Sequence, residues 1–117
     1  MPKQKTVAFK MRIRIYAGDR MLGPGKMELL ALVDSTRSLS AAAREMGMSY
    51  TRAWKLTQEL NSDADRPMIA MSRGGTSGGS AEVTAFGKKV LALYQSMERK
   101  SASAASPDGL RLARLLG

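Results

Sequence analysis

The stretch SLSAAAREMGMSYTRAWKLTQELN, residues 38–61, predicts two short helices joined by a tight turn. Ser40 is a good N-cap for the first helix, and the three alanines that follow it are strong helix formers. Gly47 ends that helix, because a residue without Cβ readily adopts positive φ. Ser49 caps the second helix, which is expected to run to Asn61 and to end there with a left-handed cap.

The spacing within this stretch matches a helix-turn-helix. That motif needs a small residue where the helices cross, a glycine or similar about four residues later, and an apolar residue about six beyond that. Ala43, Gly47 and Ala53 fill these places. Any other helical hairpin with Ala and Gly would match as well, so the motif alone leaves both interpretations open. Trp54 lies beside Ala53 and is predicted to be a core anchor rather than a base-stacking residue.

The composition narrows the class of function. Nineteen Lys and Arg against ten Asp and Glu give the 117-residue chain a net charge of +9, which is typical of a protein that binds a polyphosphate. Nucleic acid is favoured over a membrane surface, because no segment pairs a basic face with a broad apolar face. His and Cys are absent, so we expect no metal site, no cofactor and no enzymatic activity. Without a signal peptide or a long apolar run, we expect a cytoplasmic protein.

The N-terminal third is expected to support the two helices. Residues 1–8 are polar and basic, which predicts a flexible segment. Apolar and basic side chains then alternate over residues 9–16 and predict a strand with one buried and one cationic face. The sequence AGD at residues 17–19 predicts a turn. An apolar stripe of helical period predicts a helix over residues 26–36.

A β-hairpin is predicted directly after the second helix, where it would form a wing. Its strands are residues 68–73 and 81–84, and its tip is the glycine-rich loop RGGTSGG at residues 73–79. Four glycines let the backbone approach a phosphate closely. A nucleotide-binding phosphate loop is disfavoured, because the P-loop lysine and glycine spacing are missing. The hydrogen-bond donors at the tip are Arg73, Thr76 and Ser77.

The C-terminal third predicts one long helix followed by a tail. Thr84 is expected to cap a helix over residues 85–100, whose apolar stripe packs on the core or on a partner subunit. SASAASPDG at residues 101–109 predicts a linker, and the Leu-rich end predicts a short helix. The expected organisation is a flexible basic N-terminus at 1–8, a DNA-binding domain at 9–100, and a linker with a short C-terminal helix at 101–117.

With these motifs in order, the chain resembles the DNA-binding domain of the ModE family of molybdate-responsive transcriptional regulators, and more distantly the N-terminal domain of LysR-type regulators. The resemblance rests on LGPGKMELL (22–30), SLSAAAREMGMSYTRAW (38–54) and RGGTSGGSAEVTAFGKKVLALY (73–94). It implies a dimeric winged helix-turn-helix and a link to genes of molybdenum transport or metabolism. In the family, molybdate-binding domains follow this domain. The sequence does not extend into them, so oxyanion sensing is not carried over.

The sequence therefore predicts a mainly α fold with a small β wing, of winged helix-turn-helix type. The predicted function is a dimeric, sequence-specific regulator that binds double-stranded DNA. Its second helix would enter the major groove, with Arg52 on a guanine and Lys55 on a phosphate. A winged-helix protein-interaction module and a nonspecific DNA-binding protein remain as alternatives. The predicted DNA contacts are Ser40, Ser49, Tyr50, Thr51, Arg52, Lys55, Arg73, Thr76 and Ser77.

Overall fold

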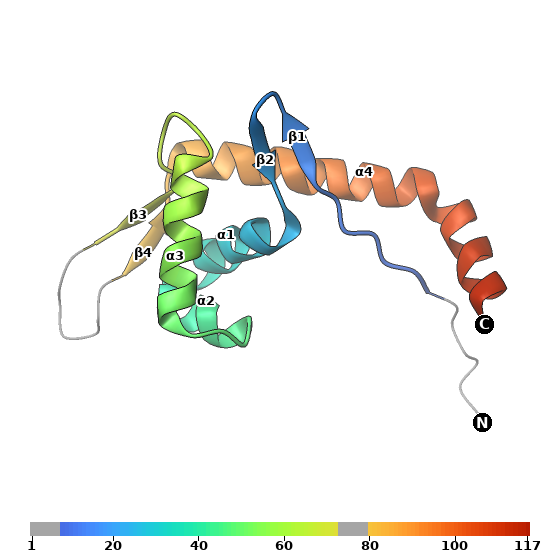
Figure 1. The fold of residues 1–117 in the computed structure, drawn as a ribbon, viewed down its shortest axis with the longest axis horizontal. Helices are drawn as coiled ribbons and strands as arrows, with labels where there is room; N and C mark the ends of the chain where they lie inside the picture. The colour runs from blue at the N-terminus through green and yellow to red at the C-terminus, as the bar shows by residue number, and fades with distance from the viewer. Residues whose placement is uncertain (1–7, 73–79) are drawn as a thin grey trace.

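The computed structural model describes residues 8–72 and 80–117, which form a mainly helical fold with two small antiparallel sheets (Figure 1). The predicted α+β composition is confirmed. The predicted flexible segment at 1–8 lies, except for its last residue, outside the described residues. The elements are β1 (Ile15–Ala17), β2 (Arg20–Leu22), α1 (Pro24–Thr36), α2 (Leu39–Glu45), α3 (Tyr50–Ser62), β3 (Ile69–Met71), β4 (Ala81–Val83) and α4 (Ala85–Leu116).

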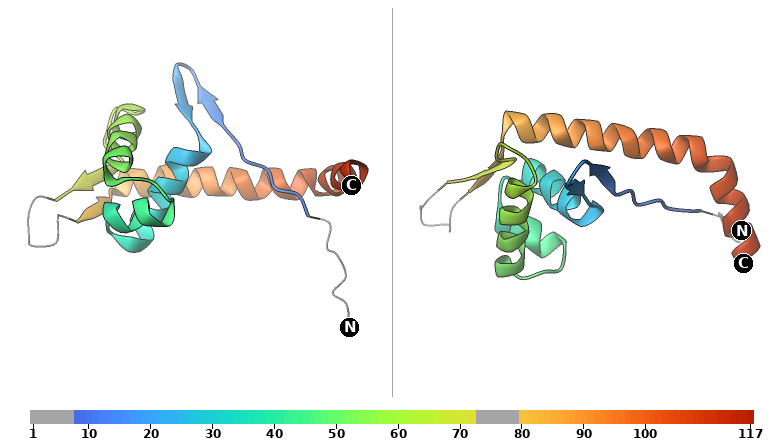
Figure 2. Two further views of the ribbon diagram at one scale, coloured as in Figure 1. Left: turned by 60° about the horizontal axis from the view of Figure 1, so that its bottom comes forward. Right: turned by 45° about the horizontal axis from the view of Figure 1, so that its top comes forward.

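The helix α4 spans the length of the molecule, and the other elements gather along it (Figures 1 and 2). The helices α1, α2 and α3 cluster beside its N-terminal half, and the β3–β4 hairpin projects from the same end. The N-terminal segment runs beside its C-terminal half. This arrangement leaves α3 at the surface, with the β3–β4 hairpin on one side of it and the β1–β2 hairpin on the other (Figure 1).

The core is built by α1, α2, α3, the β3–β4 hairpin and the N-terminal half of α4. Burial of the apolar side chains of this core is the main stabilising contribution, at about 25 cal/mol per Å² of apolar surface removed from water. Thr57 is the buried polar residue of this region, and its hydroxyl donates to the carbonyl oxygen of Ala53 at 2.9 Å. The core residues are Met27, Leu29, Leu30, Val33, Leu39, Ala42, Ala43, Ala53, Leu60, Met68, Ile69, Ala81, Val83, Leu91 and Tyr94.

Two of the three predicted N-caps are confirmed. The hydroxyl of Ser49 accepts from the amide of Arg52 at 3.1 Å, and the hydroxyl of Thr84 accepts from the amide of Gly87 at 2.9 Å. The prediction for α2 is wrong, because Ser38 and not Ser40 is its N-cap. The helix begins earlier since Leu39, which is 1% exposed, must face the core in its first turn.

The strand predicted over residues 9–16 is mostly absent. Only Ile15–Ala17 pairs, and its partner is Arg20–Leu22, a strand that the sequence did not predict. The predicted turn between them is confirmed, with Gly18 at a φ of 63°. Residues 8–14 lack a neighbouring strand to complete a ladder. They pass over α1 and α4 instead, and the hydroxyl of Tyr94 donates to the Ile13 carbonyl oxygen at 2.5 Å.

The helix break predicted at residues 101–109 is also wrong, because α4 continues through it. Ala and Ser are acceptable helix residues, and Pro107 is accommodated in a helix that bends toward its C-terminal end (Figure 2). Gly109 has a packing role there. A Cβ at Gly109 would lie 2.6 Å from ring carbons of Phe9, so the glycine makes room for that ring. The N-terminal segment is thus docked on the C-terminal part of α4.

Candidate nucleic-acid interface

The turn between α2 and α3 fixes where α3 begins. Gly47 has a φ of 67°, the left-handed conformation predicted for it. The amide of Met48 donates to the carbonyl oxygen of Ala43 at 3.0 Å, which closes the turn onto α2. Met46 and Met48 are both half-buried against the core. The N-terminus of α3 is therefore held rigidly at the surface.

One side of α3 is buried and the other is open to solvent. The buried side consists of Ala53, Thr57 and Leu60, at three- and four-residue steps. The first turn of any α-helix carries unpaired amides and the positive end of the helix dipole, which favours anions. Exposed side chains of both basic and polar type surround that end. They are Ser49, Tyr50, Thr51, Arg52 and Lys55.

A groove of about 290 Å³ follows the N-terminal half of α3 and brings four of the predicted residues together. Glu59 is the acidic member of its lining and lies one turn beyond Lys55. The basic side chains of the groove therefore lie nearest the N-terminus of α3, which is also the positive end of the helix dipole. The groove is lined by Ser49, Thr51, Arg52, Lys55, Leu56 and Glu59.

The remaining predicted residues lie elsewhere. Tyr50 is exposed at the first position of α3 but does not line the groove. Ser40 is exposed in the first turn of α2 and is also outside the groove. Arg73, Thr76 and Ser77 lie outside the described residues.

The prediction that Trp54 is a core anchor is wrong, because Trp54 is 45% exposed. That prediction rested on the position of Trp54 beside the buried Ala53. Of the four residues that lie three or four positions from it on the helix, Tyr50, Thr51 and Gln58 are exposed and only Thr57 is buried. Helical spacing alone could have placed Trp54 at the edge of the buried side.

Asn61 has a role that the sequence did not indicate. It was predicted as a left-handed cap, but it lies inside α3, which ends at Ser62 with Asp63 as its C-cap. Its side-chain oxygen accepts from the amides of Met68 and Ile69 at 2.8 and 3.0 Å, and its amide nitrogen donates to the Ile69 carbonyl oxygen at 2.9 Å. Three hydrogen bonds thus join α3 to the first strand of the hairpin.

The base of the β3–β4 hairpin is also fixed to α4. The amide of Thr84 donates to the Met68 carbonyl oxygen at 2.9 Å, and the Thr84 hydroxyl donates to the Pro67 carbonyl oxygen at 2.8 Å. At Gly87 the helix backbone passes so close that an added Cβ would lie 2.4 Å from the Met68 carbonyl oxygen. The hairpin and α3 therefore have one defined relative orientation.

The sequence of the chain is similar to those of several known proteins. The chain is 42% identical over 81 residues to the molybdenum-pterin-binding protein MopB of Rhodobacter capsulatus, an alignment that covers 69% of this chain and 30% of MopB. It is 27% identical over 119 residues to the transcriptional regulator ModE of Yersinia pestis, with 99% of this chain and 43% of the regulator covered. Its homologues are ModE regulators and molybdenum-pterin-binding proteins. No protein-family model matches the chain.

A further ModE homologue carries a more specific name. The DNA-binding transcriptional dual regulator ModE of Escherichia coli K12 is 27% identical over 94 residues, which cover 80% of this chain and 34% of that protein. The chain thus spans less than half the length of these ModE and Mop relatives. They are named as regulators or as a binding protein, and none of the three is named as an enzyme.

Over residues 8–72 and 80–117, no group of three or more acidic side chains is arranged to hold a metal ion. No helix there is long and apolar enough to cross a membrane.

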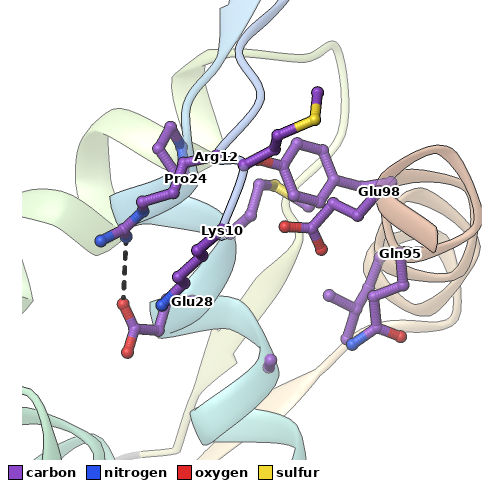
Figure 3. A pocket seen from close by; sticks show the side chains of 11 residues that line it. Lys10, Arg12, Pro24, Glu28, Gln95 and Glu98 are labelled. Atoms are coloured by element: carbon purple, nitrogen blue, oxygen red, sulfur yellow. Dashed lines mark hydrogen bonds and ion pairs between the residues drawn. The ribbon is translucent and has the colours of Figure 1, made fainter. Parts of the chain in front are cut away.

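A cleft of about 250 Å³ lies between the N-terminal segment, α1 and α4, away from α3 (Figure 3). Both charge signs line it, and Arg12 pairs with Glu28 at 3.5 Å across one side. Tyr94 also faces this cleft. Burial raises the pKa of Tyr94, the Glu98 carboxylate raises it further, and Arg12 lowers it. The hydroxyl of Tyr94 donates to the Ile13 carbonyl oxygen and so links the N-terminal segment to α4. The residues that line this cleft therefore have a structural role.

Proposed function

We propose that this chain is a sequence-specific regulator of transcription, of the ModE type, that binds double-stranded DNA through a winged helix-turn-helix in the cytoplasm. The observation that carries the proposal is the groove at the N-terminal half of α3, where Arg52 and Lys55 flank the positive end of an exposed helix. The name of the Escherichia coli relative, a DNA-binding transcriptional dual regulator, supports it. In this proposal α2 and α3 are the two helices of the motif, and the β3–β4 hairpin is the wing.

The proposed DNA contacts are of two kinds, those to bases and those to the sugar–phosphate backbone. The helix α3 enters the major groove with its N-terminus first, and Arg52 contacts a guanine because its fork can address two acceptors on one base. Lys55 contacts a phosphate, and Ser49 and Thr51 supply further polar contacts near the helix start. Tyr50 and Ser40 meet the backbone on either side. For the wing-tip residues Arg73, Thr76 and Ser77 we propose contacts to the flanking backbone or the minor groove.

A dimer is part of the proposal. Leu93 is 68% exposed and Met97 is 44% exposed on α4, where a second copy of the chain would cover them. Two copies would present two α3 helices to two half-sites, which doubles the contacts available to a small domain. Light scattering at micromolar concentration tests this, and a monomer mass would contradict it.

The names of the relatives support a proposal for the controlled genes. One of them, from Azotobacter vinelandii, is named a molybdenum transport protein, and MopB is named for binding molybdenum-pterin. We therefore propose that this regulator acts on genes of molybdenum transport or metabolism.

The proposal is tested by fluorescence anisotropy of a labelled duplex from the region upstream of the chain's own gene, beside a scrambled duplex of equal length. The salt series should give tighter binding to the upstream duplex, and an affinity that falls steeply with salt. Equal affinity for both duplexes would reduce the protein to a nonspecific DNA binder. Binding to neither would leave the protein-interaction module as the better description.

A further inference from the structure

Two aromatic side chains lie exposed next to each other on α3. Trp54, the single tryptophan of the chain, is 45% exposed, and Tyr50 is 43% exposed. Residues four apart on a helix are surface neighbours, so the two rings form one patch, here termed the aromatic step. Exposed apolar side chains gathered on a rigid helix mark a contact surface more often than isolated ones do.

The position of the aromatic step on α3 is set by Asn61. Asn61 follows Trp54 by seven residues and so lies on the same side of the helix, and its side chain binds the backbone of β3. The aromatic step is therefore on the side of α3 that faces β3.

We propose that the aromatic step contacts the sugar–phosphate backbone at the edge of the groove that α3 enters. This inference rests on the proposed function. In the proposed function the wing follows the flanking DNA backbone, so the side of α3 that faces the hairpin also faces deoxyribose and phosphate. The indole of Trp54 then covers a deoxyribose, and its Nε1–H donates to a phosphate oxygen.

Charge identifies DNA as the occupant rather than an apolar protein surface. The chain carries a net charge of +9, and Lys55 lies one residue beyond Trp54 on the same helix. A partner that brings an aromatic ring next to these cations must itself be anionic, and a DNA backbone offers both phosphates and apolar sugar faces. A contact of this kind strengthens binding to any sequence.

The single tryptophan makes the test direct. The full chain is titrated with the upstream duplex and with the scrambled duplex, while the label anisotropy on the DNA and the emission of Trp54 are recorded together. We expect the emission to change along the same curve as the anisotropy on both duplexes. Acrylamide, which reaches the exposed indole of the free protein, should quench it less in the complex.

Variants separate a DNA contact from a structural role. Trp54→Ala should lower the affinity for both duplexes about tenfold, which corresponds to about 1.4 kcal/mol, with an unchanged circular dichroism spectrum. The dependence of its affinity on salt should match that of wild type, because no charge is lost, whereas Lys55→Ala should reduce the salt slope by about 1. Trp54→Phe, which keeps a ring, should retain most of the affinity. Tyr16→Ala removes an aromatic that is 70% exposed on β1 and should change nothing.

Three results would overturn the inference in different ways. If anisotropy reports binding while the emission and acrylamide quenching of Trp54 stay constant, Trp54 lies outside the DNA contact and the proposed function stands. If acrylamide protection instead rises with protein concentration in the absence of DNA, the aromatic step belongs to a subunit interface. If neither duplex binds at all, the proposed function fails and the inference fails with it.

Discussion

Gly87→Ala is the substitution whose effect the structure specifies most closely. The added Cβ would lie 2.4 Å from the Met68 carbonyl oxygen and 2.9 Å from Cγ1 of Val83. Favourable contacts of carbon atoms lie at about 3.5–4.0 Å, so the start of α4 must move away from β3 by roughly 1 Å. The Met68 oxygen belongs to the backbone and the Val83 side chain is buried, so neither can move away by a simple rotamer change.

The magnitude follows from two opposing effects. Overpacking of a close contact costs about 1–3 kcal/mol, and any strain on the cap that Thr84 makes to Gly87 adds to it. Alanine is a better helix former than glycine by up to about 1 kcal/mol, which offsets part of this cost. We expect a net loss of about 2 kcal/mol in the free energy of unfolding. In a domain of this size that loss lowers the Tm by roughly 10 °C.

The assay is urea unfolding followed by circular dichroism at one fixed protein concentration. The matched control is Gly25→Ala in the first turns of α1, where a Cβ would meet nothing within 4 Å and φ is not positive. That variant should be as stable as wild type or more stable by up to about 1 kcal/mol. A Gly87→Ala protein as stable as the Gly25→Ala protein would refute the close approach of α4 to β3, and with it the fixed orientation of the hairpin.

The structure makes two further stability predictions. Asn61→Ala should lower the free energy of unfolding by about 1–3 kcal/mol, because the backbone groups of Met68 and Ile69 lose their partners, whereas Gln58→Ala on the exposed side of α3 should change it little. Equal stabilities in a urea titration would contradict this. The raised pKa of Tyr94 means that above about pH 10 the unfolded chain releases a proton that the folded protein keeps, so stability falls as pH rises. Tyr94→Phe should be less stable at neutral pH, through loss of the bond to Ile13, but should show a shallower decline in alkali; parallel pH curves would count against this assignment.

The parts of the fold that the sequence predicted correctly are those governed by local chemistry. The turn at Gly47 needs a residue that tolerates positive φ, and the caps at Ser49 and Thr84 need a short side-chain acceptor, so each can be recognised within about four residues. The β3–β4 hairpin was found for the same reason. Ser38 and Ser40 were both acceptable caps by type, and the burial of Leu39 decided between them.

The errors arose where distant residues decide the structure. Nothing near residues 101–109 reveals that Phe9 packs against Gly109 and so binds the N-terminal segment to a continuous α4. The strand predicted from residue 9 has the right alternation but no partner beyond Ile15. Trp54 was misassigned because it lies beside the buried Ala53, and Asn61 was misassigned because its residue type suits a helix cap. Both residues stand on the hairpin side of α3, a side that is defined only once β3 is in place.

The central claim is that the exposed N-terminal half of α3 reads DNA sequence. The most direct measurement is the ratio of affinities for the upstream and scrambled duplexes, by anisotropy, for wild type, Arg52→Ala and Lys55→Ala. We expect Arg52→Ala to weaken binding to the upstream duplex by about 1–3 kcal/mol and to lower the ratio, whereas Lys55→Ala should weaken binding to both duplexes alike and leave the ratio unchanged. Equal losses on both duplexes for both variants would contradict it.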